Sequence, residues 1–214
     1  DLIIENTQSF EKYGGSTVLI VGAGPSLQDI DLRDHEYDYL WVCNDFFKNN
    51  KYSNMDVSLF YMSSEVQVLP SSMTRMLDRG DLLGCFDINV GRDFNSLQRY
   101  RKELGERVFL FSTRMFTTVG TMPRLLNLAA YFGSSEVKFV GMDGHSREHF
   151  ESGKSYSSFE LGWKNIPAGQ SFGSQRREYL LFWEYMKKTY PNVVFTNLGK
   201  NYEHNVSKNI LGFI

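Results

Sequence analysis

A glycine-rich turn near the start of the chain has the residues best suited to hold a phosphate group. Gly22-Ala23-Gly24-Pro25-Ser26 follows the β-branched apolar run 17–21. Glycines let the backbone approach a ligand, Pro25 fixes φ and can open a helix, and Ser26 can cap it. We therefore predict a nest of N–H donors at the end of a buried strand. An ordinary tight turn between a strand and a helix fits the same residues.

Two further polar clusters could move protons. Asp45 follows Asn44, and His145 follows Asp143 and Gly144. Histidine titrates near neutrality, so His145 is a candidate general acid or base, although a structural loop histidine is an equal alternative. Asp45 fits a general base and equally a helix cap, and the Asp143 side chain could instead fix the turn at Gly144.

The histidines do not form a recognisable metal motif. His145, Glu148 and His149 lie close in sequence, but no further ligand is evident and the segment has no clear helical period. We predict that the protein binds no metal.

The elements that would position these clusters alternate between strands and helices. Short apolar runs predict strands at 17–21, 39–43, 57–62, 83–86, 107–111, 136–143 and 192–196. Helical spacing or composition predicts helices at 26–34, 71–78, 96–105, 124–132 and 174–190. This order is typical of an α/β fold with a doubly wound, mostly parallel sheet between two helical layers.

Ligands of such sheets bind beyond the carboxyl ends of the strands. Polar segments follow five of the predicted strands, which indicates a composite site, at 22–26, 44–45, 63–65, 143–145 and 197–201. Residues 147–173 are polar and aromatic without a clear period, and we interpret them as a long loop or lid over that site.

Composition narrows the classes of function. With 214 residues, the chain is predicted to form one domain over 1–214, although Asp1 is not an initiator Met and the chain could be one part of a longer protein. A net charge of −2 argues against a nucleic-acid partner, which would need a concentrated basic surface. Cys43 and Cys85 form no disulfide framework, so we expect a cytoplasmic protein.

Four blocks of sequence resemble a known family. They are Val-Gly-Ala-Gly-Pro-Ser-Leu at 21–27, Val-Cys-Asn-Asp-Phe at 42–46, Thr-Val-Gly-Thr-Met at 118–122 and Val-Gly-Met-Asp-Gly-His at 140–145. Together they resemble the bacterial sialyltransferases of glycosyltransferase family forty-two and related Rossmann-like proteins. The resemblance implies a Rossmann-like domain with a lid, a CMP-activated acidic sugar as donor substrate, and no separate cofactor.

The resemblance also implies roles for individual residues. Gly22, Ala23, Gly24 and Ser26, with Pro25 between them, would pack against the CMP phosphate and ribose. Asn44 would contact the nucleotide or the donor sugar, and Asp143 and Gly144 would complete the nucleotide site. Thr118, Val119 and Gly120 match the family's Thr-Ser-Gly turn that holds the donor, and His145 falls where the family has a tyrosine that bonds the donor phosphate.

The sequence departs from the family pattern at several positions. Ala23 replaces an asparagine, Val119 replaces the serine of the donor turn, and Met62 stands where a second asparagine is expected. The stretch 172–175, where the family has its histidine base, contains no histidine.

Our functional hypothesis is an inverting glycosyltransferase that moves a sialic-acid-like or Kdo-like sugar from a CMP donor to a surface glycan. His145 and Asp45 are its candidate catalytic residues. Two alternatives stay open: a pyrophosphokinase-like phosphotransfer enzyme, and a non-catalytic nucleotide-binding module of a larger glycan-assembly protein. The hypothesis leaves open whether the protein associates with the inner face of a membrane and whether it forms homo-oligomers.

Overall fold

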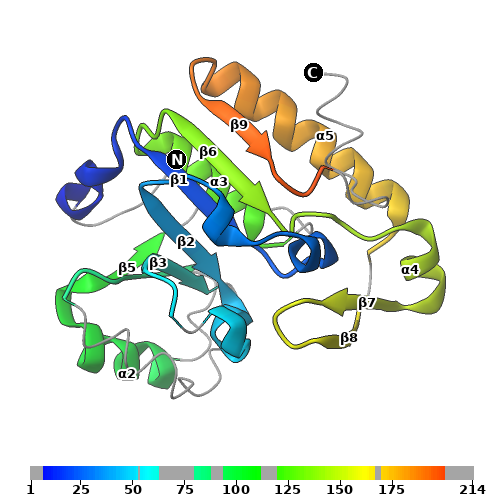
Figure 1. The fold of residues 1–214 in the computed structure, drawn as a ribbon, viewed down its shortest axis with the longest axis horizontal. Helices are drawn as coiled ribbons and strands as arrows, with labels where there is room; N and C mark the ends of the chain where they lie inside the picture. The colour runs from blue at the N-terminus through cyan, green and yellow to red at the C-terminus, as the bar shows by residue number, and fades with distance from the viewer. Residues whose placement is uncertain are drawn as a thin grey trace.

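The computed structural model describes residues 7–52, 54–62, 80–87, 94–111, 120–166 and 170–200. Within them, seven parallel strands form one sheet in the order β5-β4-β3-β2-β1-β6-β9, and β7 and β8 form a separate antiparallel hairpin (Figure 1). The sheet strands are β1 (Thr17–Val21), β2 (Tyr39–Cys43), β3 (Val57–Met62), β4 (Leu83–Asp87), β5 (Val108–Phe111), β6 (Glu136–Val140) and β9 (Val194–Asn197). All seven strands predicted from the sequence are confirmed.

Four α-helices and several 3-10 turns connect the strands in the described ranges. The α-helices are α2 (Phe94–Leu104), α3 (Met122–Tyr131), α4 (Arg147–Ser152) and α5 (Phe172–Thr189). Where one helix was predicted at 26–34, the chain forms two 3-10 turns, η2 (Pro25–Asp29) and η3 (Leu32–Asp34). The helix predicted at 71–78 lies outside the described residues. No helix in the described parts of the chain combines the length and apolar character that crossing a bilayer requires.

Helices cover both faces of the sheet. Phe139 of β6 shares its face with Ile20 and Trp41 through the parallel register, and its ring lies 5.6 Å from that of Trp183 in α5. On the opposite face, Phe60 lies 5.7 Å from Tyr100 of α2. The prediction of a doubly wound, three-layer α/β fold is therefore confirmed, and here the sheet is wholly parallel.

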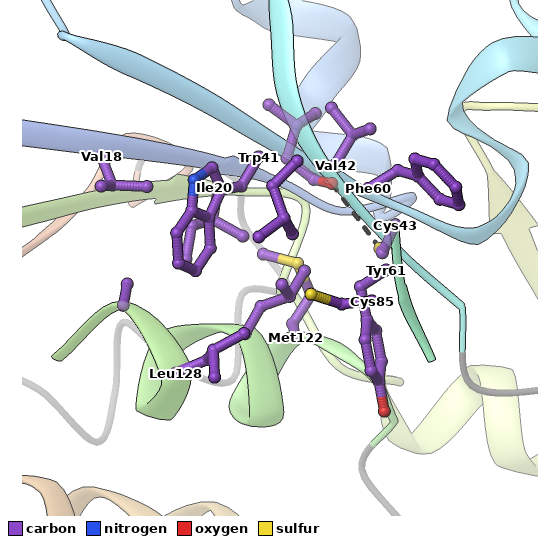
Figure 2. Packing of buried hydrophobic residues seen from close by; sticks show 14 of the residues in the cluster. Val18, Ile20, Trp41, Val42, Cys43, Phe60, Tyr61, Cys85, Met122 and Leu128 are labelled. Carbon is purple, nitrogen blue, oxygen red and sulfur yellow. Dashed lines mark hydrogen bonds between the residues drawn. The ribbon is translucent and has the colours of Figure 1, made fainter. Parts of the chain in front are cut away.

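The core explains why the central strands contain almost no polar residues. All six side chains of β3 and four of the five in β1 and β2 are buried, as expected for strands covered on both faces. Figure 2 shows Trp41 and Cys43 of β2 packing with Met122 and Leu128 of α3 beneath the sheet. Cys43 and Cys85 are buried free thiols within this core.

The segment predicted as an irregular lid, 147–173, has regular structure over most of its length, so that prediction is corrected. It contains α4 and a hairpin of β7 (Lys154–Ser157) and β8 (Gly162–Asn165). The antiparallel strands are short, and Gly, Lys and Ser interrupt any alternation of apolar side chains, which is why no period was visible. In Figure 1 the hairpin lies on the side toward which the arrowheads of β2 and β6 point.

The order of strands sets the place of the site. The chain moves outward from β1 through β2 to β5, and then returns to place β6 on the other side of β1. The connections after β1 and β6 therefore leave the sheet in opposite directions, which opens a crevice between their carboxyl ends.

Candidate functional site

A cavity of about 300 Å³ lies at this crevice. Its lining comes from segments that are distant in sequence: the turns after β1, β2 and β6, the start of α3, the β7–β8 hairpin and the first turns of α5. These segments contribute Ala23, Gly24, Pro25, Cys43, Asn44, Asp45, Gly120, Thr121, Met122, Gly141, Met142, Asp143, Gly144, His145, Ser155, Tyr156, Ser157, Phe159, Lys164, Gln170, Gln175 and Tyr179.

Most of the residues predicted for the site meet here. Nine of them line the cavity: Ala23, Gly24, Pro25, Asn44, Asp45, Gly120, Asp143, Gly144 and His145. Gly22 and Ser26 lie behind the lining rather than in it. Thr118, Val119 and the polar segment 63–65 lie outside the described residues. Of the polar segment 197–201 after β9, the described residues 197–200 do not line the cavity.

The glycine turn is joined to the corner after β6 by backbone hydrogen bonds. The N–H of Gly22 donates to the Val140 carbonyl at 2.9 Å, and that of Gly24 donates to the Gly141 carbonyl at 2.9 Å. The N–H of Ser26 donates to Asp143 Oδ2 at 2.7 Å. These three donors are therefore already used, and the predicted nest of free N–H groups is not what these residues form.

The glycines instead allow two loops to touch. A Cβ on Gly22 would come within 2.6 Å of the Gly141 carbonyl oxygen, and a Cβ on Gly24 would meet the same oxygen at 2.7 Å. Gly141 itself has φ +75, and a Cβ there would collide with the Gly22 carbonyl. Ser26 completes the junction because its hydroxyl accepts from the N–H of Gly141 at 3.1 Å. Ser26 thus stabilises this junction and does not line the cavity.

Asp143 is buried at this junction. Only 1% of its surface is exposed, and burial raises its pKa to about 6, although the hydrogen bonds from Ser26 act in the opposite direction. The carboxylate thus fixes the turn that follows β1, while the residue also forms part of the cavity wall. The alternative that Asp143 also holds the Gly144 turn stays a prediction beside this longer-range role.

Asn44 connects the end of β2 to the start of α3. Its backbone has φ 46, a left-handed conformation that asparagine tolerates better than most residues. Its Nδ2 donates to Thr121 Oγ1 at 3.0 Å. This conformation places the amide side chain of Asn44 at the cavity wall, where the sequence predicted a ligand contact.

Asp45 is engaged in ion pairs, which argues against its predicted role as a general base. Lys164 lies 2.8 Å and Lys48 2.9 Å from its carboxylate oxygens, and both lysines also pair with Glu160. Burial would raise the pKa of Asp45, but the hydrogen bonds from the two lysines outweigh it and lower the pKa. A weaker base that two cations already neutralise is poorly suited to take a proton. We call these four residues the charge ring.

His145 lines the cavity as a neutral imidazole. Desolvation by the surrounding protein lowers its pKa to about 4, with a smaller contribution from His149. The ring of Phe150 lies 5.5 Å away in an edge arrangement. At neutral pH one ring nitrogen of His145 can therefore accept a proton or a hydrogen bond while the other donates.

Gln175 fixes the backbone of His145, a role that sequence reasoning missed. Its Oε1 accepts from the His145 N–H at 2.8 Å, and its Nε2 donates to the His145 carbonyl at 2.9 Å. Gln175 is buried on the face of α5 that also carries Tyr179, Phe182 and Met186. A glutamine at the helical spacing of an apolar face is the signal that could have identified it.

The β7–β8 hairpin forms another wall of the cavity, so the segment predicted to lie over the site does contribute to it, although its regular hairpin structure was not predicted. The N–H of Ser158 donates to the Ala23 carbonyl at 2.8 Å, and its hydroxyl donates to the Gly24 carbonyl at 2.9 Å. Tyr156 lines the cavity and pairs across the hairpin with Trp163, which is 65% exposed.

His149 serves a local structural purpose. Its Nδ1 accepts from the N–H of Ser146, and the Ser146 hydroxyl accepts from the N–H of His149, which together cap α4. Across the described ranges, no group of three or more His, Cys, Asp or Glu side chains could hold a metal ion.

The chain is distant in sequence from known proteins. No family model and no characterised sequence matches it significantly. Several solved structures are similar at low identity. The sialyltransferase Cst-II in complex with a trisaccharide acceptor and CMP is 18% identical, with a TM-score of 0.47 over 86% of this chain and 82% of that one.

Two further structures are of the same enzyme. A variant in complex with CMP is 16% identical, with a TM-score of 0.49 over 87% of this chain and 82% of that one. The Campylobacter jejuni sialyltransferase CstII with the substrate analogue cytidine-5'-monophosphate is 15% identical, with a TM-score of 0.44 over 87% of this chain and 80% of that one.

Proposed function

We propose that this protein transfers an acidic sugar from a CMP-activated donor to a hydroxyl group of a glycan acceptor. One observation carries the proposal. Three of the four sequence blocks that resemble family forty-two, and the described end of the fourth, contribute residues to a single cavity at the carboxyl edge of a parallel sheet. These blocks lie far apart along the chain, so their convergence is not a consequence of sequence proximity.

The reaction requires two things of the protein. A bond between the donor's anomeric carbon and a phosphate oxygen breaks, so CMP must be held as it leaves. A bond forms between that carbon and the acceptor oxygen, whose proton must be removed. The cavity supplies a neutral imidazole, which suits the second of these tasks.

His145 is the residue we assign to proton transfer. Because its pKa is about 4, it stays unprotonated over the whole neutral range and is available to accept the acceptor's proton, as a weaker base than a solvent-exposed imidazole. Gln175 is a positioning residue that holds the backbone of His145 through two hydrogen bonds. We assign Asp45 no role in proton transfer, because the two lysines of the charge ring neutralise its carboxylate.

Ligand-dependent thermal stabilisation tests the nucleotide specificity. CMP is expected to raise the melting temperature, whereas UDP is not. A preference for ATP with Mg²⁺ would instead support a phosphotransfer enzyme and overturn the proposal. Stabilisation by CMP without any transfer from a CMP-sugar donor would point to a binding module.

His145→Ala tests the catalytic assignment. We expect transfer from the CMP donor to fall by about 10²- to 10⁴-fold, the usual effect of losing a general base, while CMP still stabilises the fold. His35→Ala, a histidine that does not line the cavity, is the control and should keep its rate. The wild-type rate should decline on the acidic side only near pH 4, and a decline centred near pH 6.5 would contradict the lowered pKa of His145.

A further inference from the structure

The β7–β8 hairpin carries an exposed tryptophan beside the proposed site. Trp163 is 65% exposed, although proteins usually cover most of a tryptophan side chain. The other two tryptophans of the chain, Trp41 and Trp183, are buried in the core. Among the described residues, the one other aromatic side chain exposed to a similar degree is Tyr131, at the end of α3 that lies away from the cavity lining.

A row of aromatic rings connects Trp163 to His145. The ring centroids of His145 and His149 are 6.4 Å apart, and those of His149 and Trp163 are 6.2 Å apart. Across the hairpin, the Trp163 ring also lies 5.7 Å from that of Tyr156, which lines the cavity. A single ring therefore separates the exposed indole from the residue to which we assign proton transfer, and Trp163 borders the site.

The neighbouring rings leave most of the indole of Trp163 uncovered. Both lie at steep angles to it, 72° for His149 and 84° for Tyr156, so neither is stacked flat on a face of the indole. A planar apolar face suits a sugar ring, whose C–H groups pack against the aromatic face while its hydroxyl groups stay hydrated. A nucleobase would stack on such a face equally well, so the choice between them depends on where each ligand lies.

The size of the cavity favours the acceptor. Its volume of about 300 Å³ is at the lower end of the range for small-molecule sites, so a glycan that shares it with the donor must extend over the surface around it. Trp163 does not line the cavity, and the ligand that it meets is therefore the one that extends outside. A hydroxyl of that glycan must reach His145, which brings the rest of the glycan to the row of rings.

We propose that the indole of Trp163 stacks on a sugar unit of the acceptor glycan, next to the unit that receives the donor sugar. This inference rests on the proposed function and adds an acceptor subsite to it. The contact acts on binding rather than on the chemical step, since the ring of His149 separates Trp163 from His145. Trp163 is thereby a specificity-determining residue, which favours acceptors that have a second sugar unit over monosaccharides.

Acrylamide quenching of tryptophan fluorescence tests the contact directly, because the structure describes all three tryptophans of the chain and only Trp163 is exposed. The probes are lactose, cellobiose and N,N′-diacetylchitobiose at tens of millimolar, with and without CMP. We expect at least one disaccharide to shield Trp163, so that quenching falls toward that of Trp163→Phe, in which only the two buried tryptophans remain. Shielding by CMP alone would mean that the base stacks on Trp163, and it would overturn the inference.

Substitutions separate the indole from its surroundings. In a ligand-observed NMR titration of the shielding disaccharide, we expect about 3- to 10-fold weaker binding to Trp163→Ala, the usual effect of losing one aromatic contact. Leu161→Ala is the matched control, since Leu161 is also 65% exposed and lies in the turn of the same hairpin, and it should bind the disaccharide like wild type. If Trp163→Ala is less stable than wild type, Trp163→Leu keeps an apolar side chain beside Tyr156 and should show the same loss.

The affinity for CMP should be the same in wild type and in all these variants. The inference is overturned, and the proposed function left intact, if CMP stabilises the protein but no disaccharide shields Trp163. Unchanged disaccharide affinity in Trp163→Ala, or an equal loss in Leu161→Ala, overturns it in the same way. Shielding by a disaccharide in a wild-type protein that CMP does not stabilise overturns the proposed function, and with it the acceptor role of Trp163.

Discussion

The two walls of the cavity are held in place by different kinds of interaction. On one side, the glycine turn and the corner after β6 are joined by buried hydrogen bonds and by backbone contacts that leave no room for a Cβ. On the other side, the β7–β8 hairpin is held by the charge ring, whose side chains are 28–41% exposed, and by the bonds of Ser158. Solvent and salt weaken the partly exposed ion pairs of the charge ring much more than the buried hydrogen bonds, which include those of Ser158 to the glycine turn. We infer that the glycine wall and the Ser158 attachment stay fixed, while the part of the hairpin near Lys164 is the part that can move.

The largest expected difference between the two walls is in how much stability is lost when one glycine of each is replaced by alanine. Gly141 and Gly153 both have left-handed backbones, with φ +75 and +68, but only Gly141 lies against another loop. Gly141→Ala should lower the free energy of unfolding by more than about 3 kcal/mol, since conformational strain and a collision with Gly22 add together. Gly153→Ala, at the end of α4, should lower it by about 1 to 2 kcal/mol from strain alone. Chemical denaturation measures both, and equal effects would refute the close approach of the two loops.

The pH dependence of stability tests the burial of Asp143 in the glycine wall. The folded protein keeps the Asp143 proton up to about pH 6, whereas the unfolded chain releases it near 3.8. The folded state therefore binds more protons in this window, and the Asp143 contribution to stability is lost as the pH rises through it. Asp143→Asn removes this dependence. The free energy of unfolding of the variant minus that of wild type should therefore increase by roughly 2 kcal/mol as the pH rises from 4 to 7.

His145 provides an internal check on that measurement. Its pKa is lowered to about 4, so its contribution has the opposite sign, and stability is lost as the pH falls from 6.5 toward 4. In wild type the two slopes oppose each other, and in Asp143→Asn the slope from His145 should be visible. A pH-independent difference between wild type and Asp143→Asn would mean that Asp143 is not buried as described.

The smallest expected effect concerns the charge ring. Glu160→Gln should lower the free energy of unfolding by less than about 1 kcal/mol at low salt, because the pairs are partly exposed. Trypsin cleavage at Lys154 and Lys164 should nevertheless become faster, and salt at about 1 M should speed the same cleavage in wild type. Glu151→Gln, an exposed glutamate of α4 outside the ring, is the control. Cleavage that responds neither to the substitution nor to salt would show that other contacts hold the hairpin.

The sheet could be predicted from the sequence because each central strand is a short apolar run that ends in a polar turn. In β1 the run from Val18 to Val21 is buried throughout, since both faces of the strand are covered. The same pattern holds for β2 and β3. Convergence of the turns after β1, β2 and β6 then followed from the geometry of parallel sheets.

The parts that could not be predicted depend on contacts between distant segments. Nothing in the residues near Asp45 shows that Lys164, 119 positions later, would neutralise it. The N–H groups of the glycine turn were expected to be free for a ligand because their acceptors, such as the Gly141 carbonyl, lie in another loop. The hairpin was missed because its strands are short and half-polar, whereas Gln175 could have been found from its place on the apolar face of α5.

The way the hairpin is attached determines how easily evolution can replace it by another insertion. Its two ends are adjacent, since Lys154 pairs with Asn165 and the N–H of Ile166 donates to the Gly153 carbonyl at 2.9 Å. A replacement segment can thus be joined at a single place without altering the strand order, provided that it also supplies donors for the Ala23 and Gly24 carbonyls that Ser158 satisfies. New ligand preferences could then be acquired by replacing one insertion while the scaffold beneath it is inherited unchanged.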